Sequence, residues 1–459
     1  MRARFMRHRP MRSGLVRAGL LVGLRCASAG LTFGLQIFLA RIMAPEEYGF
    51  YVIAWTALLV LGSLAGLGFA EAAVRFIPRY EARGRTSRLA HFLAIGAAAT
   101  LAGGLGLALA FGLVGMLAPL APEWRVVVLI VAAGLPFLAV EFYAEGVARG
   151  LGWYGLTTVP SYFLRPIAVA GGAFLIAAET GAIGAAQAGV VLVAVLALLA
   201  AGSAALVHHR VRRVLTEGRR GGLAHHERPG ARLWVCAALP LMLVGVIEDV
   251  LHYGDVLILG MLLEPEEVAV YFAASRSMAL ASFVAYAFYL VAGRDFALAQ
   301  AGRDRRLLET RVRAASRATF WCTLAAVVLT LAAGPVVLAA FGEAYRVGYA
   351  VMAILAVGFV VQATAGQASE LLLVLGHARA VVAVGAAAIA VNVLMIVLMA
   401  PQWGIVGGAI AAAVTMALRA TALILVCRAK TGIAVFAVGW PWPGRSRGAT
   451  AAAAPATSP

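Results

Sequence analysis

Charged side chains inside long apolar stretches are the residues of this sequence that can do chemistry. Asp255 lies ten residues before Pro265, in a predicted turn, and Arg276 lies eleven residues after it. On two antiparallel helices this spacing puts both side chains at the same depth, about 15 Å from the turn. A charge at the bilayer centre costs about 2.5–3.5 kcal/mol on insertion scales. The sequence therefore predicts a structural ion pair between Asp255 and Arg276.

A second set of charges flanks a predicted turn near Gly152. Glu141 precedes this glycine by eleven residues and Arg165 follows it by thirteen. Glu145 lies one helical turn after Glu141, so the two carboxylates share one face. Two interpretations remain open at this stage. The carboxylates form either a proton or cation site coupled to an ion gradient, or a packing element that Arg165 neutralises.

Two further arginines, Arg25 and Arg419, lie within apolar stretches and have no obvious local partner. Because an unpaired charge in lipid is unfavourable, they either face a wet cavity or pair with an acidic residue of another stretch. Two of the acidic residues, Glu248 and Asp249, lie within one helical turn of His252, and this cluster is suited to gating or to proton relay. The acidic candidates for pairing, ion coupling or gating are Glu248, Asp249 and Glu370. Glu71 and Arg75, one turn apart, are predicted to pair with each other.

Twelve apolar stretches must position these charges. The chain is 63% hydrophobic and 13% charged, with a mean hydropathy of +0.91, whereas a soluble domain carries about 25% charged residues. A helix needs about 20 apolar residues to cross a bilayer, and backbone groups in lipid must be satisfied within their own segment, which favours helices. The predicted spans are residues 16–41, 47–72, 88–118, 125–149, 155–177, 182–207, 233–261, 266–293, 316–341, 347–374, 379–400 and 404–427.

The basic residues are distributed unevenly across the predicted membrane. Of the 38 Lys and Arg residues, 31 lie in or beside the tails and loops of one side, and three lie in loops of the other side, namely Arg41, Arg125 and Arg346. This is the positive-inside signature of a multi-pass protein with both termini in the cytoplasm. It also accounts for the net charge of +17 without a nucleic acid partner.

The loops are too short to form domains of their own. Loops 208–232 and 294–315 fall below the usual minimum of about 40 residues for independent folding. Residues 302–317 are predicted to lie on the membrane surface as a short basic helix. The predicted division is a basic N-terminus (1–15), a six-helix lobe (16–207), a linker (208–232), a second six-helix lobe (233–427) and a disordered tail (428–459).

Neither the cysteines nor the histidines are spaced as metal ligands. The four cysteines all lie in apolar stretches, and the histidines of the basic linker have no carboxylate or cysteine at ligand spacing. We therefore predict no metal site and no cofactor. Lys430 is the single lysine among 38 basic residues, which, with the high alanine content, is typical of a GC-rich bacterial genome.

The chain contains an internal repeat. Residues 37–54 read IFLARIMAPEEYGFYVIA and residues 257–274 read LILGMLLEPEEVAVYFAA, so that Pro45 and Tyr51 match Pro265 and Tyr271 at an offset of 220. GAIGAA (181–186) aligns with GIVGGA (404–409) at an offset of 223. Each half would hold six helices, an even number. The halves are therefore parallel repeats, with a cavity expected between them near the membrane midplane.

Several of these motifs resemble the polysaccharide transport family, the O-antigen and exopolysaccharide flippases. The resemblance rests on the segment LARIMAPEEYGFYVIA with the following GLGFAEAAVRFIPRY, on GDVLILGMLLEPEEVAVYFAASR, on glycine turns at Gly150–Gly152 and Gly376, and on PQWGIVGGAIAA. It covers about residues 15–428. The family belongs to the superfamily of multidrug and oligosaccharide-lipid exporters. The fold that the resemblance implies is an all-α polytopic membrane protein with twelve transmembrane helices in two pseudo-symmetric six-helix lobes.

The resemblance also implies a function. It is alternating access, which moves a polyprenyl-pyrophosphate-linked oligosaccharide from the inner to the outer leaflet of a bacterial cytoplasmic membrane. Glycosyltransferases, a polysaccharide polymerase and membrane lipids would be its partners, and no covalent step is needed. A pyrophosphate needs cationic donors, and the planar guanidinium fork suits it. The substrate-binding candidates are therefore Arg25, Arg419 and Arg165.

Two alternatives stay open. A multidrug or small-solute exporter of the same superfamily would favour an acidic cavity, and the unpaired Arg25 and Arg419 weigh against it. A membrane polymerase or ligase would need a sizeable outer loop, whereas every predicted outer loop has fewer than about ten residues, a length typical of bare connections. The sequence leaves open the glycan, the coupling ion, the transport direction and the oligomeric state.

Overall fold

The computed structural model describes residues 11–220, 230–282 and 305–433, together with the single positions 292, 296, 299 and 435. The side chains of residues 11–26, 154, 214 and 217–220 lie outside this description. Within the described ranges every element is helical and no strand occurs. The prediction of an all-α membrane protein is therefore confirmed, as expected for a chain whose backbone groups must be satisfied inside each segment.

The first half of the chain breaks its second predicted span into two helices. At Gly66–Gly68 the backbone turns through positive φ angles, 47° at Leu67 and 73° at Gly68, and the helix then restarts and continues ten residues beyond the predicted end at 72. The elements of this half are α1 (Met11–Ile42), α2 (Pro45–Ala65), α3 (Phe69–Ala82), α4 (Thr86–Leu117), α5 (Pro122–Gly150), α6 (Tyr154–Val159), the π-helical turn η1 (Pro160–Leu164), α7 (Arg165–Thr180) and α8 (Ala185–Arg220).

The second half differs from the sequence prediction at two places. Residues 305–317 form the first turns of one continuous helix rather than a separate surface helix, and the predicted span 347–374 is broken at Gly366 (φ 50°) into two helices. Gly404 (φ 54°, ψ −138°) folds the last helix into two arms, which match the predicted spans 379–400 and 404–427. The elements are α9 (Ala231–Gly260), α10 (Pro265–Ala279), α12 (Arg305–Phe341), the 3₁₀ turn η2 (Glu343–Gly348), α13 (Tyr349–Thr364), α14 (Ala368–Val374) and α15 (Ala378–Thr431).

Nine helices of the described part are long and apolar enough to cross a membrane. This number counts the two arms of α15 once, and it leaves out α10 and the short apolar part of α1 at Ala27–Ile42. A multi-pass membrane protein follows from these helices. The number of twelve spans, the division into domains and the cytoplasmic location of both termini stay predictions.

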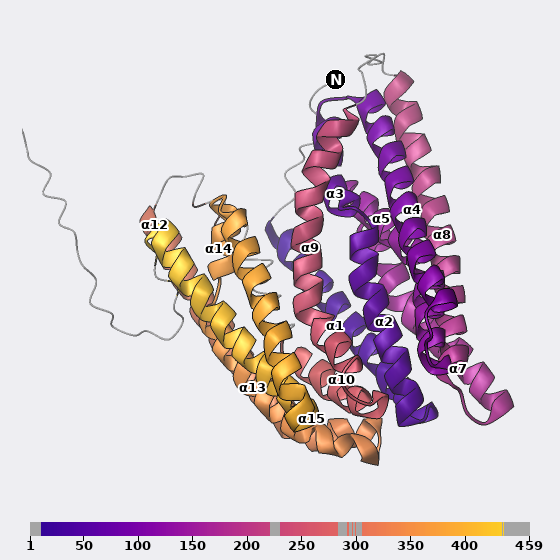
Figure 1. Cartoon of the computed structure of the whole chain (residues 1–459). Helices are drawn as coiled ribbons and strands as arrows, with labels where there is room; N and C mark the ends of the chain where they lie inside the picture. The colour runs from indigo at the N-terminus through magenta and orange to yellow at the C-terminus, as the bar shows by residue number, and fades with distance from the viewer. Residues whose placement is uncertain are drawn as a thin grey trace, which may run out of the picture.

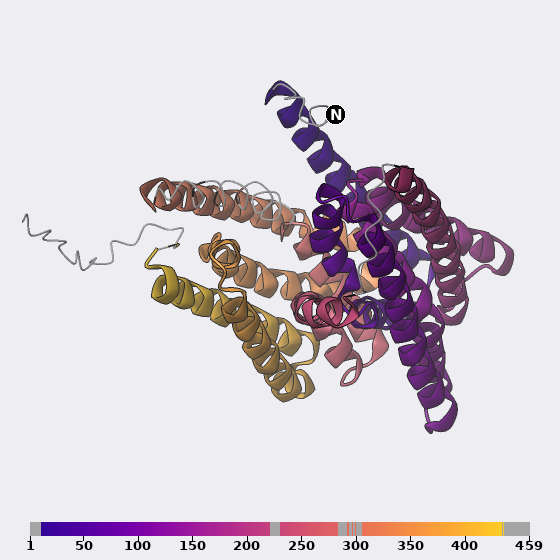
Figure 2. The ribbon, with the colours of Figure 1, turned by 90° about the horizontal axis from the view of Figure 1, so that it is seen from above.

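The helices gather on two sides of the molecule. Figure 1 shows α4, α5, α7 and α8 on one side and α12 to α15 on the other, with α2, α9 and α10 between them. The two sides meet at the lower end of this view and diverge toward the upper end, where α8 ends and α9 begins. Figure 2, seen from above, shows α12 and α15 lying apart from α4 and α8. The positive-inside rule predicts that the diverging end is the inner end, and the two ends are named the inner and the outer end on this basis.

The buried apolar clusters follow the same pattern. One cluster joins both halves at the outer end and includes Tyr48 and Tyr51 of α2 together with Tyr271, Phe341 and Tyr345 of the second half. At the inner end the cores are separate, since Leu308, Leu371 and Leu423 form one cluster, whereas Phe69, Phe92 and Trp234 belong to another. Among the described residues, the helices from α12 onward share a core with the first half only at the outer end, whereas the start of α9 is part of the inner core of the first half.

The start of α9 packs against the first half, although it opens the second. The Trp234 side chain is buried among α3 and α4, and its Nε1–H donates a hydrogen bond of 2.7 Å to the Tyr80 hydroxyl. Further along, Leu259 of α9 lies against Gly408 of α15. This helix thus has neighbours on both sides of the molecule.

Both copies of the repeated motif have the same local geometry. Pro45 and Pro265 each occupy the first turn of their helix after an extended residue, where proline fits because its missing N–H has no helical partner. The Glu47 carboxylate accepts a hydrogen bond of 2.6 Å from the Ala185 N–H at the start of α8. Its counterpart Glu267 lies beside Gly404, where the second arm of α15 begins. The second glutamate of each motif therefore lies at the start of the last helix of its half.

We predict that Glu47→Ala destabilises the fold by about 1 kcal/mol, because it removes an acceptor from a helix N-terminus. The measurement is the thermal unfolding midpoint in detergent. Glu46→Ala is the matched control, since Glu46 is exposed and precedes Glu47 in the same turn; it is expected to change the stability by less than about 0.5 kcal/mol. Equal midpoints for the two variants would show that Glu47 has no capping role.

Candidate functional site

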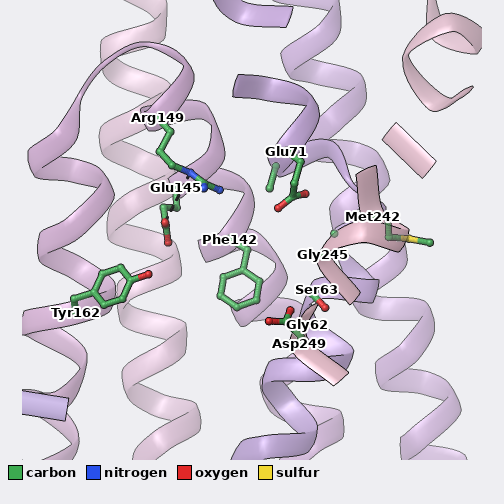
Figure 3. Close-up of a pocket in the computed structure, with 12 residues that line it drawn as sticks. Gly62, Ser63, Glu71, Phe142, Glu145, Arg149, Tyr162, Met242, Gly245 and Asp249 are labelled. Carbon is green, nitrogen blue, oxygen red and sulfur yellow. Dashed lines mark ion pairs between the residues drawn. The ribbon is translucent and has the colours of Figure 1, made fainter. Parts of the chain in front are cut away.

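A cavity of about 180 Å³ lies at the break between α2 and α3, facing α9. Its walls come from both halves of the chain, because α2, α3, α5 and η1 meet the middle of α9 there (Figure 3). The lining residues are Gly62, Ser63, Gly66, Ala70, Glu71, Phe142, Glu145, Arg149, Tyr162, Met242, Gly245 and Asp249.

Carboxylates outnumber cations in this cavity. Glu71, Glu145 and Asp249 line it from three different helices, and Arg149 is the single basic residue among the described residues of its walls. Arg149 Nε lies 3.8 Å from Glu145 Oε1, one helical turn away. Asp249 of α9 lies beside Ser63 of α2. The described walls at this position are acidic, whereas the sequence predicts arginines in a cavity between the halves; the role of these arginines as cavity cations stays a prediction.

Glu141 and Arg165 form the ion pair that their spacing predicts. Arg165 Nη2 lies 2.7 Å from Glu141 Oε1, and the Ser161 hydroxyl donates a hydrogen bond of 2.8 Å to the same oxygen. The Glu141 side chain is only 1% exposed, and the guanidinium also lies over the Trp55 ring, 5.5 Å from its centroid. Of the two open interpretations, the geometry favours the neutralised packing element for Glu141. Glu145 points into the cavity instead.

Arg419 has a partner on the neighbouring helix. Its Nη2 donates a hydrogen bond of 2.7 Å to Glu248 Oε1, which joins α15 to α9. The Glu248 side chain is 43% exposed and that of Arg419 is 13% exposed. This pair is therefore more accessible than the Glu141–Arg165 pair. His252 lies one turn further along α9, and its Nδ1 is 3.1 Å from the Glu248 carbonyl oxygen.

The predicted ion pair between Asp255 and Arg276 does not form, although both side chains are described. Asp255 Oδ2 instead accepts a hydrogen bond of 2.6 Å from the Tyr271 hydroxyl. Arg276 Nη2 donates to the His252 carbonyl oxygen at 2.6 Å, and its guanidinium lies 4.6 Å from the Tyr253 ring centroid. Equal depth is not sufficient for pairing. Tyr271 and Arg276 lie five positions apart on α10, so they face different sides of the helix, and it is Tyr271 that reaches Asp255.

The other predicted residues are dispersed. Arg25 lies on α1, but its side chain is outside the description. Glu370 is partly buried in the first turn of α14 and makes no ion pair with a described side chain. Glu71 makes no ion pair with Arg75 either, so that prediction is also wrong; it faces the cavity with Asp249. In the ranges that the structure covers, no three potential ligands lie close enough to hold a metal ion.

Sequence reasoning missed three polar residues of the cavity: Ser63, Arg149 and Tyr162. One signal was present, the pair of glycines at 66 and 68 inside a predicted span. Glycine-interrupted spans are where transporter binding sites form, because an unwound helix is tolerated only beside a cavity or inside protein. Arg149 falls at the end of its span, where an arginine is ordinarily assigned to the membrane surface.

Comparisons with known proteins give the following similarities. A family model described as polysaccharide biosynthesis protein matches residues 17–292. An inward-facing multidrug resistance MATE transporter of the MOP superfamily aligns with a TM-score of 0.67 and 16% identity, covering 88% of this chain and 94% of that one. The lipid II flippase MurJ, in an inward closed conformation, gives 0.68 and 12% identity, with 89% and 87% covered.

A third solved structure has the same fold. It is a MOP superfamily transporter from Pyrococcus furiosus, with a TM-score of 0.59 and 14% identity, covering 89% of this chain and 94% of that one. A sequence comparison with curated proteins gives no match. At these identities the structures share the fold of the chain.

We predict that Glu141→Gln destabilises the protein by about 3–5 kcal/mol, because it leaves the buried Arg165 guanidinium without its counter-charge. The double variant Glu141→Leu/Arg165→Met removes both charges and is expected to be markedly more stable than Glu141→Gln. The measurement is thermal unfolding in detergent. The control is Glu145→Gln, one turn further along and facing the cavity. If Glu141→Gln and Glu145→Gln unfold at the same temperature, Glu141 is not a structural counter-ion.

Proposed function

We propose a function from one premise: this chain belongs to the polysaccharide biosynthesis protein family. The proposed function is that of a flippase for a polyprenyl-pyrophosphate-linked oligosaccharide, such as an O-antigen or exopolysaccharide repeat unit. The match of residues 17–292 to this family is the observation that carries the proposal. A transporter rather than an enzyme is also favoured by the fold, which the chain shares with MOP superfamily transporters and a lipid II flippase.

The arrangement of the two halves supports alternating access. They share one buried core at the outer end, whereas at the inner end the described core of α12, α14 and α15 is separate from the core that α3, α4 and the start of α9 form. A head group would enter from the inner side, between the diverging halves, while its polyprenyl tail stays in lipid. Net movement then requires a second state with the opposite closure, and a ligand or a gradient must bind the two states with different affinities.

Arg419 is the described cation best suited to receive the pyrophosphate. It lies on α15, and its partner Glu248 on α9 is nearly half exposed. A diphosphate would compete with Glu248 for the same planar guanidinium, because both offer paired oxygens to its N–H groups. Arg25 is retained as the second cation of the proposal. Arg165 is held by Glu141 and Trp55, so its proposed contribution is to position α5 against α7.

The cavity acids supply the proposed coupling or gating groups. Glu145 and Asp249 lie on opposite walls, one on α5 and the other on α9. A proton or cation bound between them would draw the two halves together, because it offsets their mutual repulsion. Glu248 and Glu370 are the remaining candidates for this role. The proposed location is the cytoplasmic membrane of a bacterium, beside the glycosyltransferases and the polymerase that make and use the glycan, with membrane lipids around it.

One observation favours a second candidate function. Three carboxylates and one arginine line the cavity, and an excess of acidic groups attracts cationic solutes into a cleft. An exporter of cationic small molecules would use such walls directly. Transport of a cationic dye that depends on Glu71, Glu145 and Asp249 would support this function.

The proposed function predicts that the purified protein in proteoliposomes moves a fluorescent polyprenyl-pyrophosphate oligosaccharide between leaflets, measured by its accessibility to a membrane-impermeant quencher. Arg419→Ala and Arg25→Ala are each expected to lower the rate at least tenfold, which corresponds to the loss of about 1.4 kcal/mol of interaction with the pyrophosphate. Arg346→Ala is the matched control, because Arg346 is exposed at the outer end and pairs with Glu343 in its own turn.

Three outcomes distinguish the alternatives. Normal rates for both arginine variants would remove the pyrophosphate role assigned to them. Movement of a cationic dye with no movement of the glycolipid would replace the flippase with the exporter. Longer glycans recovered from the vesicles would indicate a polymerase or ligase.

A further inference from the structure

Arg41 joins the two halves of the chain at the outer end. It lies in the last turn of α1, and its guanidinium reaches the end of α12, almost 300 residues further along. Its Nε–H donates a hydrogen bond of 2.6 Å to the Ala340 carbonyl oxygen. Its Nη2–H donates a second one, also 2.6 Å long, to the Ala339 carbonyl oxygen. One planar side chain thus holds two consecutive carbonyls of the opposite half.

These carbonyls are natural acceptors for a cation. α12 ends at Phe341, and the last four carbonyls of a helix have no N–H partner of their own. The Leu338 carbonyl accepts a hydrogen bond from the Gly342 N–H, whereas the next two carbonyls, of Ala339 and Ala340, accept hydrogen bonds from Arg41. The helix dipole also places partial negative charge at this end, which favours a cationic partner. The Arg41 side chain is exposed, so water can replace these bonds when they break.

The contact lies at the margin of the shared outer core. The Phe33 ring of α1 packs edge-to-face on Phe341, with centroids 5.6 Å apart, and Phe341 in turn lies 5.7 Å from the Tyr345 ring. Arg41 therefore donates to the two carbonyls directly before Phe341, whose ring makes the aromatic contacts between the two halves. The repeat places Met261 at the equivalent position of the second half. Since the methionine side chain has no N–H to donate, the pair of hydrogen bonds that Arg41 makes has no equivalent at Met261.

We propose that Arg41 is a latch that holds the outer end of the transporter closed, and that its release is a required step in forming the outward-open state. The proposal rests on the alternating access proposed above. Opening at the outer end separates α1 from α12, so the two hydrogen bonds must be exchanged for bonds to water. The latch is reversible because each bond is exposed, and it is directional because it stabilises only the outer-closed state.

The test measures the conformation directly. Spin labels at Leu117 of α4 and Val347 of η2, which are 78% and 69% exposed at the outer ends of opposite halves, report the outer separation by double electron–electron resonance. The full chain, with its four cysteines replaced by alanine, is studied in lipid nanodiscs. Arg41→Ala is expected to raise the ratio of long to short distances about tenfold. Arg41→Lys, which keeps the charge but not the planar fork, is expected to give a smaller shift.

Arg346→Ala again serves as the control. It removes one positive charge from the same face, but its partner Glu343 lies within η2, so no bond between the halves is lost. An unchanged distance distribution in Arg41→Ala, or an equal shift in Arg346→Ala, would overturn the latch. If Arg41→Ala does not fold, Arg41→Lys is measured in its place, and an unchanged distance distribution or a shift equal to that of Arg346→Ala would again overturn the latch. The readout is a distance, so failure of glycolipid transport with a normal Arg41 shift would refute the substrate and leave the latch intact.

Discussion

Placing charged side chains among apolar helices is the constraint on which the rest of this structure depends. A charge in lipid needs a counter-charge, a polar partner or water. Three of the arginines within the helices are paired in three different ways. Glu141 and Arg165 neutralise each other in the interior. Arg419 reaches a half-exposed glutamate on the next helix. Arg276 uses a backbone carbonyl and an aromatic face in place of a carboxylate.

These pairings determine which charges remain on the cavity walls. Because Arg165 and Arg419 are engaged by Glu141 and Glu248, the acids that remain near the broken second helix are not neutralised by them. The described walls of the cavity are therefore acidic in a protein with a net charge of +17, whose basic residues are predicted to lie mostly at the inner side. A phosphate group approaching from the inner side would meet the basic surface first and the acidic cavity afterwards.

Sequence reasoning predicted those features that depend on position along one axis. Span location and the Glu141–Arg165 pair follow from counting residues at about 1.5 Å each along a helix, whereas sidedness rests on the distribution of basic residues and stays a prediction. The same counting failed for Asp255 and Arg276, because it gives depth but not the direction in which a side chain points, and Tyr271 was better oriented toward Asp255. Ser63, Arg149 and Tyr162 were missed as cavity residues for a related reason, since the walls converge from helices far apart in the sequence.

The repeat is symmetric where it builds the fold and asymmetric where it joins the halves. Glu47 and Glu267 lie at equivalent positions beside the last helix of each half, because each half must start that helix after the same glycine turn. Arg41 has no such counterpart, since Met261 occupies its equivalent position. A pair of identical lobes would hold the outer end by two equal clamps, and both would have to break together. A single exposed clamp lowers the number of bonds that opening must exchange with water, while the buried aromatic contacts still fix where the two halves meet.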